Sequence, residues 1–242
     1  MTQIELKKLT HELRLFGIHE SFERRCAEAA HEGLTGAELL IRIFEDERQH
    51  RKNTVTKALE TKAKFRRNAL LEQWDTTQDR GLTKTKIREL ATLGFWQAKK
   101  NLIIMGQTGS GKTQLSIALG RVACQMQLSV LFMPVNQFFE EALANRASGK
   151  MIQWKKKIEK HDVIILDDFG LRSYSHEEAV LLTDFLEERY QKSVHIISSQ
   201  CDIEGWKTLF EDPIIADALI DRLKNPSEKI KLTGGSYREK LG

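Results

Sequence analysis

The stretch Gly106-Gln107-Thr108-Gly109-Ser110-Gly111-Lys112-Thr113 decides how this chain folds. It fits the pattern G-x-x-x-x-G-K-[ST] of a phosphate-binding loop, in which glycines let consecutive backbone N–H groups approach phosphate oxygens. Lys112 is expected to reach the β- and γ-phosphates of a nucleotide, and the Thr113 hydroxyl is expected to bind Mg²⁺. The apolar run 101–105 predicts a strand before the loop, and a helix that starts near Gln114 would add the positive end of its dipole. The sequence therefore predicts a site for ATP and Mg²⁺.

A second acidic signature follows about 55 residues downstream. The apolar run 163–166 predicts a buried strand that ends in Asp167 and Asp168, where P-loop nucleotidases place their Walker B acids. Asp167 is expected to hold Mg²⁺, usually through water, and Asp168 to orient the attacking water. Many relatives have Glu at the second position, so the shorter Asp168 predicts slower hydrolysis. The alternative is that one of the two aspartates is only a turn residue.

Two further elements are candidates for the hydrolytic machinery. The expected strand 194–198 is followed by Ser199 and Gln200, where ATPases of the AAA+ kind place a polar side chain that contacts the γ-phosphate and the attacking water. Arg222 ends a helical stretch and could reach the nucleotide of a neighbouring subunit as an arginine finger, which stabilises transition-state charge. A surface ion pair is an equally good interpretation of Arg222.

Short apolar runs alternate with helical patterns through the second part of the chain. Strands that alternate with helices predict a parallel sheet flanked by helices on both faces, so the predicted fold class is α/β with a P-loop ATPase core. The expected strands are 101–105, 128–133, 163–166, 194–198 and 229–232, and the expected helices are 114–127, 136–147, 176–191 and 213–223.

The first third of the chain is predicted to be helical. Residues 6–16 follow the apolar spacing of a helix, and Gly17 is expected to stop it. Thr35 and Glu38 fit a capping box, which predicts a long helix that reaches about Phe65. We therefore expect a small all-α N-terminal domain over 1–68, a linker over 69–84 and the ATPase domain over 85–242.

Basic residues are concentrated between Arg48 and Arg67, where eight Lys and Arg stand against one acid, Glu60. The segment therefore carries a formal charge of +7, whereas the whole chain carries +4. Such a block beside a nucleotide-binding core predicts contacts with the phosphates of duplex DNA that do not depend on base sequence. A solvated helix face is the alternative. The candidate DNA contacts are Arg48, Arg51, Lys52, Lys57, Lys62, Lys64, Arg66 and Arg67.

Composition excludes several other classes of protein. With 40% hydrophobic and 30% charged residues, the chain is typical of a globular protein. Cys26, Cys124 and Cys201 are odd in number and far apart, which argues against a disulfide framework or a zinc site and favours a reducing cytoplasm. No apolar stretch approaches the length of a membrane span, so no membrane partner is expected.

The order and spacing of these elements resemble the IstB family of transposition-helper ATPases, which are related to the bacterial helicase loader DnaC. Walker motifs occur in many ATPases, whereas Asp-Arg-Leu followed by Ser-Tyr-Arg near the end is more specific. The N-terminal pattern, from Leu13–Gly17 through Gly33–Thr35 and Phe65–Arg67, also resembles the DNA-binding helical region of that family, so the similarity spans nearly the whole chain. The matching segments are 106–113, Leu166–Gly170, Ser199-Gln200 with Trp206, Asp221–Leu223 and Gly235–Arg238.

This resemblance implies an AAA+ ATPase that assembles as a homo-oligomer on duplex target DNA when ATP is bound and stimulates a partner transposase. It also implies that Arg222 is an arginine finger acting in trans and that Arg238 contacts phosphate or a neighbouring subunit. The family usually has Asn where this chain has Gln200, a departure that bears on hydrolysis more than on binding or assembly.

Three other functions compete with this interpretation. A replicative helicase loader shares the ATPase core but would favour a helicase partner and single-stranded DNA. A P-loop small-molecule kinase would need an acceptor site and a lid, not a basic segment long enough for DNA. An ATP-gated assembly factor would have the same partners and hardly hydrolyse ATP, as Gln200 and Asp168 allow.

Overall fold

The computed structural model describes residues 3–76 and 80–235. The chain divides into two compact units, Met1–Ala58 and Leu59–Gly242. Among the described residues, no helix combines the length and the apolar character that crossing a membrane requires.

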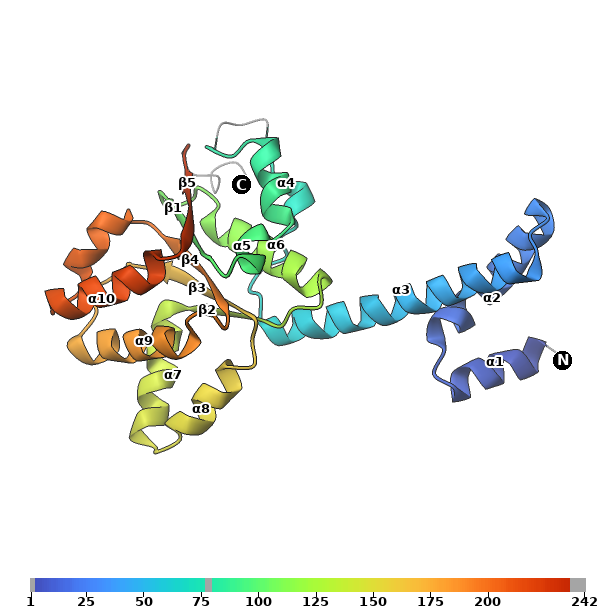
Figure 1. Ribbon diagram of the computed structural model, residues 1–242, viewed down its shortest axis with the longest axis horizontal. Coiled ribbons are helices and arrows are strands. Elements are labelled where there is room, and N and C mark those ends of the chain that lie inside the picture. The colour runs from blue at the N-terminus through green and yellow to red at the C-terminus, as the bar shows by residue number, and fades with distance from the viewer. Residues whose placement is uncertain (1–2, 77–79, 236–242) are drawn as a thin grey trace. The chain divides into compact units, whose positions relative to one another are not determined.

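The second unit is built on five parallel strands in the order β2-β3-β4-β1-β5 (Figure 1). This order confirms the predicted parallel sheet, and each strand lies within a few residues of its expected position. The strands are β1 (Asn101–Gly106), β2 (Val130–Pro134), β3 (Val163–Phe169), β4 (Val194–Ser199) and β5 (Ser227–Leu232).

Helices cover both faces of this sheet because the strands are apolar on both sides. On β1, Leu102 and Ile104 pack into the core that contains α4 (Lys84–Ala91), α5 (Gly94–Gln97) and α6 (Lys112–Gln125). Ile103, between them, packs into the core formed with the opposite layer. That layer consists of α7 (Val135–Ala147), α8 (Met151–Ile158), α9 (His176–Arg189) and α10 (Pro213–Lys224).

In the segment predicted as a linker, 69–84, the described residues 69–76 and 80–84 belong to the second unit, and some of them lie in its core. Ala69, Leu71, Trp74 and Leu82 are buried in the core layer of α6, and Leu71 begins the short helix η1 (Leu71–Gln73). The boundary between the units also lies at 58/59 rather than 68/69. The linker prediction failed because the average composition of the segment is polar, which is typical of solvent-exposed chain, while a few apolar side chains anchor it in the core.

The first unit contains α1 (Gln3–Glu12), α2 (Phe16–Glu32) and most of α3 (Gly36–Ala63), whose last residues belong to the second unit. The predicted capping box is confirmed, since the Thr35 N–H donates to Glu38 Oε2 at 2.8 Å and the Glu38 N–H donates to Thr35 Oγ1 at 3.3 Å. The prediction for Gly17 was wrong. The chain turns at Leu13–Leu15, and Gly17 lies in the first turn of α2.

Gly17 allows α2 to cross α3 at very short range. A Cβ at this position would lie 2.7 Å from Glu47 Cα and 2.7 Å from His50 Cβ. The buried Glu47 Oε2 accepts the N–H groups of Gly17 and Ile18 at 2.8 and 3.2 Å, and Oε1 accepts from Arg51 Nε at 2.6 Å. The first N–H groups of a helix have no acceptor within it, so Glu47 supplies from α3 the cap that α2 lacks.

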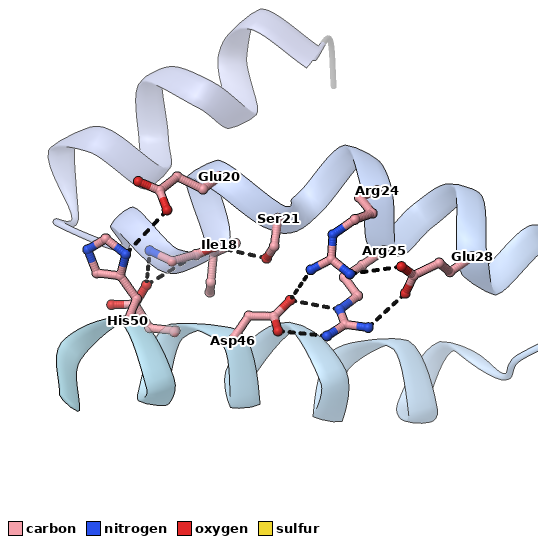
Figure 2. A network of polar contacts seen from close by, with 10 residues as sticks. Ile18, Glu20, Ser21, Arg24, Arg25, Glu28, Asp46 and His50 are labelled. Carbon is pink, nitrogen blue, oxygen red and sulfur yellow. Dashed lines mark hydrogen bonds and ion pairs between the residues drawn. The ribbon is translucent and has the colours of Figure 1, made fainter. Parts of the chain in front are cut away.

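A second polar link between the same helices is the Arg25–Asp46 pair (Figure 2). Arg25 Nε and Nη2 each donate to one oxygen of Asp46 at 2.7 Å, while Nη1 donates to Glu28 Oε2 at 2.7 Å. Hydrogen bonding from Arg25 is the largest effect on Asp46 and lowers the pKa of its carboxyl to about 2. The two-pronged geometry orders both side chains and favours one register of α2 on α3.

Gly17→Ala is expected to destabilise the helices of the first unit by about 1–3 kcal/mol, because the added methyl group must push α2 away from α3. Amide hydrogen exchange measured along α2 in the full chain would report this loss. Gly36→Ala is the matched control, since a Cβ at Gly36 has no atom within 4 Å. Unchanged protection in Gly17→Ala would show that the close crossing is not required.

Asp46→Asn is expected to lower the stability of the first unit by on the order of 1 kcal/mol at pH 6. The pKa of Asp46 is lower in the folded chain than in the unfolded chain, so this contribution is present above about pH 4 and is lost as the pH falls through about 2. Thermal melting followed by circular dichroism should therefore show a gap from the unmodified chain that narrows with acid. Asp217→Asn, in an exposed pair with Lys207, is the control and should show no such gap.

Candidate nucleotide-binding site

The predicted phosphate-binding loop lies at the carboxyl ends of the strands, where α/β sheets bind ligands. It connects β1 to α6 and borders a cavity that the ends of β3 and β4 also reach. The cavity is lined by Arg66, Arg67, Thr108, Gly109, Gly111, Lys112, Thr113, Gln114, Asp167, Asp168 and Gln200.

The loop has the backbone shape that its glycines predict. Gly111, with φ of 98°, precedes the first turn of α6, and a Cβ there would lie 3.0 Å from the Trp74 ring. Lys112 Nζ donates to the carbonyl oxygens of Gly106 and Gln107 at 2.8 and 2.9 Å, so the ammonium group is held against the loop. The Ser110 hydroxyl is buried and has no hydrogen-bond partner among the residues that the structure describes.

Asp167 and Thr113 are in direct contact. The buried carboxylate of Asp167, at the end of β3, accepts from Thr113 Oγ1 at 3.0 Å with each oxygen and also from the Ser198 hydroxyl. Burial is the largest effect on Asp167 and, together with the charge of Asp168, raises the pKa of its carboxyl, although the hydrogen bonds from Ser198 and Thr113 lower it. A carboxylate whose charged form is penalised by burial gains strongly from a cation placed beside it.

Asp168 also lines the cavity, and its backbone is left-handed, with φ of 60°. The pairing of β3 with β4 is interrupted between Leu166 and Phe169, so Asp168 lies in a bulge. Its N–H donates to Ser198 Oγ at 3.0 Å. One β4 hydroxyl thus contacts both predicted Walker B residues.

The two candidate sensor residues have different surroundings. Gln200 lines the cavity, and its Oε1 accepts from Thr108 Oγ1 at 2.8 Å. Ser199 is fully buried outside the cavity lining, and its hydroxyl accepts from Trp206 Nε1 at 2.9 Å and from the Cys201 N–H at 3.2 Å. Of the two candidates, the structure thus brings Gln200 to the cavity, while the Ser199 hydroxyl binds the indole of Trp206, and a contact of either residue with the nucleotide stays a prediction.

Arg222 does not line this cavity in its own chain. It forms an ion pair with Glu187 of α9, and its Nη1 donates to the Ala218 carbonyl oxygen at 3.0 Å. Arg238, the other arginine implied by the family resemblance, lies outside the described residues.

All eight candidate DNA contacts are exposed, but they do not form one group. At 3.6 residues per turn, Arg48, Arg51 and Lys52 fall within about 100° of the circumference of α3, and Lys57 falls on the other side. Arg51 already binds the buried Glu47. Lys62 is on the last turns of α3, and Lys64 follows the helix. Arg66 and Arg67 line the phosphate-loop cavity.

Sequence reasoning missed two residues at this site. Ser198 contacts Asp167 and Asp168, but the sequence offers two adjacent serines, and the register of β3 on β4, in which Leu166 pairs with Ile197, places Ser198 beside Asp167. Trp74 supports the loop beneath Gly111, and the Arg80 guanidinium lies 4.7 Å from the centre of its ring. A tryptophan within a polar segment was the available signal for this second role.

The residues present fit ATP and Mg²⁺. Thr113 and Asp167 bring a hydroxyl and a carboxylate to one point, and oxygen donors of this kind are the ligands that Mg²⁺ prefers. Lys112 and the start of α6 supply positive potential at the loop. The unpartnered Ser110 hydroxyl indicates a polar loop built for a ligand, since buried polar groups normally have partners.

Similarity to known proteins agrees with this geometry. The family model of the IstB-like ATP binding protein matches residues 8–241. The chain is 30% identical to a protein of Pseudomonas aeruginosa named as an ATP-binding protein of insertion sequence IS21, over 98% of this chain and 89% of that protein. It is 32% identical to an insertion sequence ATP-binding protein of Sinorhizobium fredii, over 93% of this chain and 91% of that protein.

Solved structures share the fold of the second unit. The crystal structure of DnaI has a TM-score of 0.56 at 23% identity and covers 70% of this chain and 90% of DnaI. The DnaC helicase loader has a TM-score of 0.55 at 18% identity and covers 69% of this chain and 97% of DnaC. AMPPCP-bound DnaA from Aquifex aeolicus has a TM-score of 0.58 at 16% identity and covers 70% of this chain and 51% of DnaA. The chain therefore belongs to the IstB-like ATP-binding protein family and is an ATPase with the AAA+ P-loop fold.

Proposed function

We propose that this protein is the ATP-dependent DNA-binding helper of an insertion sequence. In this proposal it binds ATP with Mg²⁺, assembles with further copies of itself on duplex target DNA and stimulates a partner transposase. The observation that carries the proposal is the convergence of Lys112, Thr113, Asp167, Asp168 and Gln200 at one end of the sheet, in a chain of the IstB-like family.

Each of these side chains has a role that follows from its place. Lys112, already held at the loop, would bind the β- and γ-phosphates, while Thr113 and Asp167 would hold Mg²⁺. Bound Mg²⁺ would neutralise the charge that develops on the phosphates. Asp168 would orient the attacking water, and Gln200 would position it or the γ-phosphate from the other side of the cavity.

Arg222 is proposed to act on the nucleotide of a neighbouring subunit. Its absence from the lining of its own chain's cavity agrees with a role in trans. The ion pair with Glu187 holds the guanidinium on α10, and a subunit arriving with bound nucleotide would offer a more highly charged partner. Arg238 is proposed to contact phosphate or a neighbouring subunit.

The duplex-binding surface is proposed to centre on α3 of the first unit. Arg48 and Lys52 are exposed on neighbouring turns of that helix, as contacts with a DNA backbone require. Arg51 donates a hydrogen bond to the buried Glu47, so in this proposal it contributes less to DNA binding than its charge suggests.

A helicase loader is the second candidate, because DnaI and the DnaC helicase loader share the fold of the second unit. Electron microscopy of the purified chain with long duplex DNA and with single-stranded DNA, with and without ATP, distinguishes the two. ATP-dependent multimers along the duplex support the transposition helper. Assembly on single strands alone would favour the loader.

Lys112→Ala is expected to abolish both ATP binding and ATP-dependent assembly. Asp168→Asn should retain ATP binding and assembly but slow phosphate release by about 10²-fold or more, because the attacking water loses its carboxylate. Titration with a fluorescent ATP analogue, phosphate release and sedimentation velocity measure the three properties. Assembly that survives Lys112→Ala would mean that oligomerisation does not depend on the P-loop.

Charge reversal at Arg48→Glu and Lys52→Glu together should weaken duplex binding by about tenfold or more and reduce the dependence of affinity on salt. The matched control is Lys99→Glu with Lys100→Glu, which changes the net charge equally in the second unit. Fluorescence anisotropy with duplexes of unrelated sequence gives the affinities. Equal losses in the two variants would indicate a net-charge effect rather than a surface on α3.

A further inference from the structure

Arg66 and Arg67, two of the candidate DNA contacts, lie at the nucleotide-binding cavity. They line the cavity of the phosphate-binding loop together with Lys112, Asp167 and Asp168. Both side chains are exposed, and among the described residues neither guanidinium has a carboxylate partner. We propose that Arg66 and Arg67 bind the phosphate tail of the nucleotide held by the P-loop of their own chain. The proposal rests on nucleotide binding at that loop, as proposed above.

The segment that carries the two arginines is fixed at its start. Lys64, with φ of 61°, follows the last residue of α3, and Phe65 then packs into the core of the second unit, to which it belongs. Its ring lies 6.5 Å from that of Phe132 on β2, and a Cβ at Gly120 would lie 2.9 Å from Phe65 Cε1. Gly120 is in α6, the helix that follows the P-loop. Because Gly120 has no side chain, Phe65 lies directly against this helix.

The segment is also fixed at its end, again on α6. Arg121 donates to the side chain of Asn68 and forms an ion pair with Glu60 at 3.2 Å. Ala69, the next residue, is buried. Anchors at Phe65 and Asn68 leave two residues between them, and both border the cavity. Fixed main chain on either side lowers the entropy cost of ordering these side chains around a ligand.

The charge of the cavity gives the arginines a reason to be there. Lys112 contributes +1 and the two aspartates −2, so these three residues alone leave a net charge of −1. These three side chains alone therefore do not balance the negative charge of a polyphosphate. Arg66 and Arg67 bring the charge of the lining to +1. Guanidinium groups bind phosphate with two parallel hydrogen bonds, which makes arginine better suited than lysine to this role.

This placement connects the nucleotide to the helix that carries the basic block. Only Lys64 and Phe65 separate Arg66 from the end of α3. Phosphates bound by Arg66 and Arg67 would also restrain the last turn of α3. In this proposal, nucleotide binding at the P-loop therefore reduces the motion of the chain where that helix ends.

The test compares two double variants for binding of ATP and of duplex DNA, each ligand being measured in the absence of the other. Arg66→Ala with Arg67→Ala removes the proposed phosphate contacts, and Arg48→Ala with Lys52→Ala removes the same charge from α3. Affinity for a fluorescently labelled ATP is measured without DNA, and affinity for duplex DNA is measured without nucleotide. The first variant should lose about tenfold or more in ATP affinity and less than about twofold in DNA affinity, and the second should show the reverse.

Further variants keep each outcome interpretable. Arg66→Lys with Arg67→Lys retains the charge and should recover part of the lost ATP affinity, and circular dichroism should show that all variants are folded. ATP affinity unchanged in the double alanine variant, or a loss of DNA affinity alone, overturns the proposal. If Lys112→Ala also leaves ATP binding intact, the P-loop site itself fails, which is a failure of the proposed function and not of Arg66 and Arg67 alone.

Discussion

The need to satisfy one buried carboxylate organises the second unit around its site. Asp167 lies at the end of β3 with almost no access to solvent, and burial without partners would disfavour its charged form. The hydroxyls of Thr113 and Ser198 supply the partners, and they come from α6 and β4. Three elements that are distant in sequence therefore meet at a single group. The phosphate-binding loop leads directly into one of them, α6.

The same helix, α6, joins this site to the preceding part of the chain. Its first turn carries Lys112 and Thr113, and its middle receives Phe65 at Gly120 and Asn68 at Arg121. The loop and the segment after α3 therefore contact the same helix, although about 40 residues separate them in sequence.

The elements with a strong local pattern were predictable from the sequence. The P-loop requires glycine at set spacings, and the buried strands show as apolar runs, so the five strands and the helices α6, α7, α9 and α10 followed from the sequence. The short helices α8 and η2 (Ile203–Leu209) were not predicted. Contacts that depend on register or on rare anchors were not predictable. The pairing of Leu166 with Ile197 places Ser198 rather than Ser199 beside Asp167, and two neighbouring serines in the sequence give no sign of this register. Likewise, the sequence grouped Arg67 with the basic block because of its charge, whereas in the structure Arg67 lines the cavity.

The left-handed backbone at Asp168 constrains how this enzyme can change over evolution. That conformation is uncommon for residues other than glycine, and Asp and Asn tolerate it better than longer side chains do. A glutamate would bring a longer reach but would have to adopt the same strained backbone, at a cost of about 1 kcal/mol or more. The left-handed backbone therefore favours the short acid over glutamate at this position. A glutamate that kept this backbone would retain the hydrogen bond from its main-chain N–H to Ser198 but would carry the conformational cost.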